Sequence, residues 1–256
     1  MRIAGTGHAV FAVLMIGVGI LGLAQGGFAP VWEPVPKWVP AREALVWLSA
    51  FISLGSGLGL LWRRAAAPAA GMLLVSLLLW VLVFRLPGLA RAPGVAANWE
   101  GCGETVVMLA GAWALYAGFV ARPGRLAFAG GHSGLRIARS LYGLALIPFG
   151  LAHFAYVKET AALVPGWLPA HVAWVYFTGA AYLAAGAAVL SGVWARPAAA
   201  LSAVQMGLFT LLVWVPVVAA AGPKQAFQWS ETVVSAALTA AAWVVAESWQ
   251  GSRSVA

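Results

Sequence analysis

Eight long apolar runs, separated by short polar segments, dominate the pattern of hydrophobic and polar positions along the chain. Each run is close to the ~20 residues that an α-helix needs to cross ~30 Å of hydrocarbon. The runs are apolar on all sides, as helices in lipid are, and they lack the alternation over ~10-residue segments that is typical of a membrane β-barrel. The sequence therefore predicts an all-α polytopic membrane protein with eight transmembrane helices, at roughly 7–27, 43–62, 66–86, 102–121, 137–157, 171–193, 197–220 and 229–248.

Short motifs of the first half of the chain recur in the second half, in the same order and at nearly one offset. The matched pairs, offset by 127 to 129 residues, are 22–25 with 150–153, 35–41 with 164–170, and 104–107 with 231–234. This pattern predicts a duplication in which each unit holds four helices. Because four is even, both units enter the membrane from the same side. The repeats are therefore expected to be parallel, unlike the inverted repeats of many transporters.

Composition narrows the class of protein further. Hydrophobic residues make up 62% of the chain and charged residues 9%, which excludes a soluble enzyme and a disordered chain. The net charge of +8 comes from basic residues scattered between the apolar runs, which favours a role in topology over nucleic-acid binding. A single cysteine, Cys102, excludes an internal disulfide and a cysteine metal cluster.

The distribution of basic residues predicts the orientation in the membrane. Nine of them fall on the side that carries both termini, and six, Arg85 among them, fall on the other side. Both termini are therefore expected in the cytoplasm of a bacterium, with the chain in the inner membrane. The organisation that follows is a first unit at 1–121, a basic cytoplasmic linker at 122–136, and a second unit at 137–256.

The candidate ligand-binding residues of the second unit surround His153, an ionisable residue inside an apolar run. Such residues usually face a bundle interior or a wet cavity. Glu231, at the predicted start of the last helix, is its expected partner, and Tyr156 and Thr178 complete the predicted polar pocket. Two alternatives remain open: His153 as a hydrogen-bonded core residue, and Glu231 as a first-turn residue behind an N-capping Ser230.

The first unit has Gln25 and Glu104 at the matching positions. Glu100 and Glu104 are four residues apart, so they share a helix face if the helix begins early enough, and otherwise mark its outer-surface start. Trp38 and Trp167 each lie between two prolines, which makes their loops stiff. Either tryptophan could belong to an interfacial aromatic belt or contact a ligand at the mouth of the bundle.

The second unit resembles the DoxX-like family of membrane proteins. The resemblance is carried by residues 139–153 (RSLYGLALIPFGLAH), the loop 163–169 (LVPGWLP), Thr178-Gly179 and the segment 196–200 (RPAAA). It covers about 137–248 and extends more weakly to 7–121. The resemblance implies a four-helix membrane unit; some members are linked to thiosulfate:quinone oxidoreductase, and a distant eukaryotic relative exports cargo from the endoplasmic reticulum. It supplies no catalytic residues.

These features favour a non-enzymatic membrane protein that acts as an accessory or small-lipophile-binding subunit, in contact with the bilayer and with a partner membrane protein. No bound cofactor is expected. The alternative is a redox subunit that binds quinone near His153 and Glu231. A third class is a transporter, for which interrupted helices or charges inside the membrane would be expected; the sequence shows neither clearly.

Overall fold

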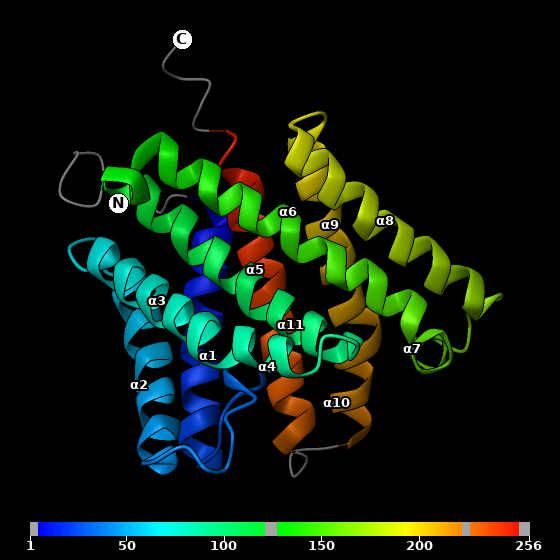
Figure 1. Ribbon diagram of the computed structural model, residues 1–256, viewed down its shortest axis with the longest axis horizontal. Coiled ribbons are helices and arrows are strands. Elements are labelled where there is room, and N and C mark those ends of the chain that lie inside the picture. Colours follow the sequence, from blue (N-terminus) through cyan, green and yellow to red (C-terminus); the bar gives the residue numbers. More distant parts are fainter. Residues whose placement is uncertain (1–4, 121–126, 222–225, 251–256) are drawn as a thin grey trace.

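Helices are the only regular secondary structure over the residues described by the computed structural model, which are 5–120, 127–221 and 226–250. Eight spans are long and apolar enough to cross a membrane, which confirms the predicted fold class of an all-α polytopic membrane protein. Six of them are single helices: α1 (Thr6–Gln25), α2 (Arg42–Leu61), α5 (Ala96–Phe119), α6 (Gly131–Ala155), α8 (His171–Ser191) and α11 (Ala226–Glu247) (Figure 1).

The other two spans contain a π-helical segment. In the first, η2 (Val81–Arg85) joins α3 (Ala66–Trp80) to α4 (Leu86–Arg91). In the second, η4 (Thr210–Trp214) joins α9 (Ala195–Phe209) to α10 (Val215–Ala221). Short π-helical segments of this kind are frequent at functional sites.

Three shorter helices lie in the connections. They are η1 (Pro30–Trp32), η3 (Ala127–Ala129) and α7 (Val157–Leu163). The segment around η1 folds into the bundle, where Trp32 is buried and donates a hydrogen bond from Nε1 to Ser53 Oγ (3.0 Å). By contrast, α7 has no buried residue.

Several helices begin earlier than the apolar pattern predicts. α5 begins at Ala96 instead of 102, and α6 begins at Gly131, inside the range predicted as linker. Residues 122–126 of that range lie outside the described residues, as do both ends of the chain. The early starts have a common reason: polar residues such as Glu100 and His132 can continue a helix beyond the apolar run that defines its core.

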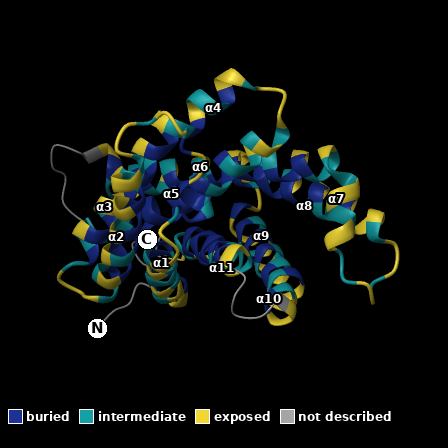
Figure 2. Ribbon diagram, turned by 90° about the horizontal axis from the view of Figure 1, so that it is seen from below, coloured by how far each residue is buried: buried dark blue, intermediate teal, exposed yellow. Residues whose placement is uncertain are grey.

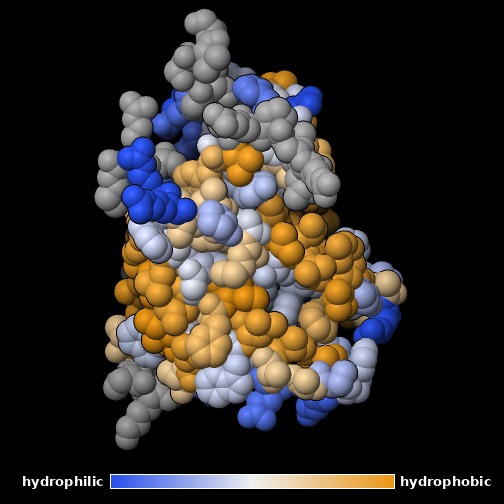
Figure 3. All heavy atoms as spheres, turned by 90° about the vertical axis from the view of Figure 1, so that its left-hand side faces the viewer, coloured by the Kyte–Doolittle hydropathy of each residue, from blue (hydrophilic) through white to orange (hydrophobic). Residues whose placement is uncertain are grey.

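The eight spans form a closed ring of neighbours. In order, α1 packs on α2, α2 on α3, α3 on α5, α5 on α6, α6 on α8, α8 on α9, α9 on α11, and α11 on α1. α5 and α11 also pack against each other across the ring, and α5 is the most buried span (Figure 2). On the outside, Figure 3 shows a broad apolar band between two more polar ends, as a bilayer requires.

The two halves share more than their motifs. Helices α2 and α8 begin 129 residues apart, as do α3 and α9, η2 and η4, and α4 and α10. Ala41 and Ala170, which precede α2 and α8, both adopt positive φ values, 52° and 57°. The buried positions of α2 also recur in α8 at this spacing, for example Ser53 with Tyr182 and Leu60 with Val189. The halves therefore present comparable faces to the interior.

Candidate functional site

A groove of 340 Å³ lies between α8 and α9 on the outside of the second half. Half of its lining residues are alanine, and Ser202 and Gln205 are its polar members. Leu201 lines it and is 68% exposed inside a membrane span, so the groove faces the surrounding lipid. Trp194, which is 78% exposed, stands at one end. The full lining is Ala181, Ala184, Ala185, Ala188, Trp194, Pro197, Ala198, Leu201, Ser202 and Gln205.

The corresponding helix pair of the first half, α2 and α3, differs from α8 and α9 by one methyl group at this level, because Gly59 corresponds to Ala188. Between α2 and α3, a Cβ added to Gly59 would lie 2.6 Å from Cβ of Ala69, so the helices approach closely because residue 59 is glycine. The residues 129 positions later are Ala188 and Ala198. Two alanine Cβ atoms cannot approach to 2.6 Å, so this pair cannot repeat the close contact of Gly59 with Ala69.

The polar residues beneath the groove are fixed by hydrogen bonds. The hydroxyls of Tyr142 and Ser202 share a hydrogen bond of 2.7 Å, and Gln205 donates from Nε2 to the carbonyl of Thr178 (3.0 Å). Tyr182 interacts with Gln205 from the same side. These contacts leave a pre-oriented polar floor under apolar walls, which is the usual composition of a small-molecule site.

His153 lies next to this floor but contacts different neighbours from those predicted. Its Nδ1 is 2.7 Å from the carbonyl oxygen of Phe149 on its own helix, and its ring meets the edge of Tyr182, with centroids 5.5 Å apart. Within the part of the chain that the structure describes, no hydrogen bond or ion pair joins it to Glu231. The contacts of His153 are those of the core-residue alternative, and its pairing with Glu231 stays a prediction.

The remaining predicted residues of the second half make local contacts. Tyr156 accepts a hydrogen bond at its hydroxyl from the backbone N–H of Ala97, at the start of α5 (3.2 Å). Thr178 donates from its hydroxyl to the carbonyl of Trp174 (2.8 Å). Trp167 is 71% exposed on its proline-flanked loop. Ser230 does not cap α11, because the helix begins four residues earlier.

Three glutamates form a carboxylate cluster within the bundle. Glu100 and Glu104 of α5 lie on one helix face, and Glu231 of α11 lies within electrostatic reach of Glu104. Because α5 begins at Ala96, Glu104 lies about 12 Å along the helix from its first residue. Over the described residues, these three half-buried carboxylates make no hydrogen bond or ion pair. Glu104 is therefore a residue within the span and does not mark the start of the helix.

Arg85 brings a positive charge to the same region. In the sequence it lies at the end of the run 66–86 and was counted with the basic residues of the outer side, but its side chain is only 7% exposed. Nε donates to Thr105 Oγ1 (2.9 Å), and Nη2 donates to the carbonyls of Pro30 (3.3 Å) and Val31 (3.4 Å). Gly101 makes room for it, since a Cβ there would lie 2.7 Å from Nη1. The signal in the sequence was an arginine that still belongs to an apolar run.

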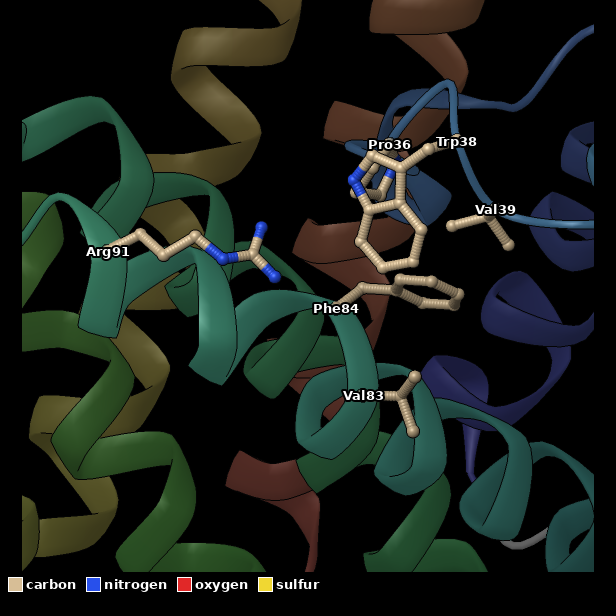
Figure 4. A pocket seen from close by; sticks show the side chains of 6 residues that line it. All are labelled: Pro36, Trp38, Val39, Val83, Phe84 and Arg91. Atoms are coloured by element: carbon tan, nitrogen blue, oxygen red, sulfur yellow. The ribbon is translucent and has the colours of Figure 1, made fainter.

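The other two predicted ligand-binding residues of the first half, Gln25 and Trp38, lie in different parts of the structure. Gln25 joins α1 to α11, because its Nε2 donates to the carbonyl of Ala226 and its Oε1 accepts from the hydroxyl of Ser230, both at 3.0 Å. Trp38 is 72% exposed and lines a small cavity against η2 (Figure 4). Tyr182, which orders the groove floor together with Gln205, was not chosen from the sequence as a ligand residue, because nothing in its spacing marks it.

Comparison with known proteins identifies no relative of this chain. The chain matches no protein-family model, no curated protein and no solved structure. The resemblance to DoxX-like proteins therefore remains a prediction from the residues.

Proposed function

We propose that this multi-pass membrane protein binds a small lipophile in the groove between α8 and α9, without catalysing a reaction. The groove itself carries the proposal. Its alanine walls would contribute ~25 cal/mol for each Å² of apolar ligand surface that they bury. The fixed hydroxyl of Ser202 and amide of Gln205 would orient a ligand that carries a polar group. A quinone belongs to this class of lipophile, and this groove supports its binding better than the predicted His153–Glu231 pair does.

The setting of this function is also part of the proposal. The spacing of 129 residues that relates helix starts, π-helical segments and buried positions supports a tandem duplication of a four-helix, DoxX-like unit. In this account the first unit keeps its α2–α3 seam closed, and the second unit has become the ligand-binding one. The excess of basic residues at one end of the bundle supports an inner-membrane location with both termini in the cytoplasm. An accessory subunit would present its ligand to a partner membrane protein.

Filling the groove tests the proposal. Ala188→Leu places a larger side chain inside it, whereas Ala187→Leu adds the same atoms to an exposed position of α8 that does not line it. Both proteins are purified from native membranes, and their bound lipophiles are quantified by mass spectrometry. We expect one co-purifying lipophile to be lost from Ala188→Leu and kept in Ala187→Leu. Equal lipophile content in both variants would contradict the proposal.

A second candidate function, transport, gains support from two observations. Two spans contain π-helical segments, which are frequent at functional sites. In addition, Arg85 lies buried near Glu104 inside the bundle, and a charge buried within a span is expected of transporters. If protons move through this cluster, proteoliposomes with a trapped pH-sensitive dye should show a flux that Glu104→Gln abolishes. The absence of flux from the unmodified protein would reject proton transport.

A further inference from the structure

A second cavity, of 170 Å³, lies in the first half between the Trp38 loop and the π-helical segment η2. The loop contributes Pro36, Trp38 and Val39, η2 contributes Val83 and Phe84, and the end of α4 contributes Arg91. Figure 4 shows the guanidinium of Arg91 directed toward the rings of Trp38 and Phe84. The site therefore combines one cation, two aromatic rings and aliphatic surface.

The polar groups of this cavity are available to a ligand. In the described part of the chain, neither the guanidinium of Arg91 nor the indole N–H of Trp38 has a hydrogen-bond or ion-pair partner. Both side chains are exposed, Trp38 by 72%. Among the described residues, no carboxylate, amide or hydroxyl side chain lines the cavity. The site can thus donate hydrogen bonds and neutralise an anion, but it offers no side-chain acceptor.

The apolar part of the site continues into the membrane. Val83 is 56% exposed inside the span Ala66–Arg91, and Arg91 ends that span. A molecule that touches both must be apolar along Val83 and anionic at Arg91. Tryptophan and arginine also hold these positions in many proteins as simple interfacial anchors, but an anchor needs no cavity between the two side chains.

The second half offers the same loop without the cation. Trp167 and its flanking prolines correspond to Trp38 and its prolines, but the residue 129 positions after Arg91 is Ala220, and the residue after Phe84 at this spacing is Val213. The two loops therefore form a natural comparison. The difference between them is the charge and the ring, and not the stiffness of the loop.

We propose that this cavity binds the phosphate headgroup of an acidic phospholipid from the adjacent leaflet. Arg91 and the indole N–H of Trp38 donate to the phosphate oxygens, and an acyl chain lies along Val83 and Phe84. An acidic lipid fits better than a zwitterionic one, because the lining has no acceptor side chain for an ammonium group. This site is independent of the α8–α9 groove.

The test measures binding of phosphatidylglycerol and of phosphatidylcholine with identical chains to the full-length protein, by native mass spectrometry. The unmodified protein is expected to bind one phosphatidylglycerol more tightly than phosphatidylcholine. Arg91→Gln should weaken this binding about 10- to 100-fold, because hydrogen bonds to charged groups are strong. Trp38→Phe, which keeps a ring but loses the donor, should weaken it about 2- to 10-fold.

Two matched variants separate a built site from diffuse attraction. Lys37→Gln removes a charge from the same loop outside the cavity, and Trp167→Phe makes the ring change in the other half; both should leave phosphatidylglycerol binding unchanged. An equal loss in Lys37→Gln, or no loss in Arg91→Gln, would overturn the proposal. Equal affinity for the two lipids would overturn the preference for an acidic headgroup. Binding of inorganic phosphate alone, with the same dependence on Arg91, would indicate a site for a small anion instead.

Discussion

The buried arginine of the first half offers a direct energetic prediction. Arg85→Met keeps an unbranched, mostly apolar side chain, although a shorter one, and removes the charge and all of the donors. The bond from Nε to Thr105 Oγ1, at 2.9 Å, is the one with good geometry; the bonds to the carbonyls of Pro30 and Val31 are long. A hydrogen bond that involves a charged group contributes about 1.5–3 kcal/mol.

The acceptors that Arg85 leaves keep other partners, which limits the cost. The carbonyl of Val31 also accepts from the hydroxyl of Thr105, and the carbonyl of Pro30 accepts from the backbone N–H of Glu33. Because both carbonyls keep a donor and the hydroxyl of Thr105 still donates to a carbonyl, we expect Arg85→Met to lower the free energy of unfolding by about 2–3 kcal/mol and not by the sum of three bonds.

The assay is reversible unfolding in mixed detergent micelles, with Arg64→Met as the control. Arg64 is exposed and makes no side-chain hydrogen bond among the described residues, so its loss should change stability by less than about 0.5 kcal/mol. If Arg85→Met behaves like Arg64→Met, the guanidinium does not hold η1, η2 and α5 together, and the reasoning fails.

Three further predictions follow from packing and topology. Gly59→Ala should destabilise the protein by about 1–3 kcal/mol through overpacking. Gly55→Ala should be tolerated, because its added Cβ would have its nearest neighbour at 3.9 Å. The free energy of unfolding of both variants checks this prediction, and equal effects would contradict it. Reporter fusions after Arg64 and after Lys158 should report the cytoplasm and the outside, respectively, and a result on the same side would reject the topology. His153→Ala should keep the groove lipophile in a co-purification experiment, because His153 does not line the groove; loss of the lipophile would favour the predicted His153–Glu231 site.

The sequence predicted the spans well because hydrophobicity over ~20 residues is the same physical quantity that the bilayer selects. It was less accurate at helix ends. Glu100 and Glu104 lie within α5, since a helix continues through polar residues once its hydrogen-bonded ladder is formed. Arg85 was counted as a surface charge because a sequence shows that a residue is charged, but not that carbonyls from η1 will surround it.

The candidate site was harder to predict for a related reason. His153, Thr178 and Tyr156 were chosen because they are polar in an apolar context, and the structure places each against a backbone group or ring within hydrogen-bonding or contact distance. The groove instead depends on a difference between two helix pairs. Position 59 on α2 is glycine and faces α3, whereas the corresponding position 188 on α8 is alanine and lines the groove with α9. The consequence of this difference becomes visible only when the distance between the facing helices is known.

Site-specific photocrosslinking in native membranes tests the lipophile site most directly. A benzophenone amino acid is placed at Leu201, which lines the groove, and separately at Met72, the exposed residue 129 positions earlier. Adducts formed on illumination are identified by mass spectrometry. The account predicts one dominant lipophile adduct at position 201 and the bulk phospholipid mixture at position 72. The same bulk mixture at both positions would contradict a specific site between α8 and α9.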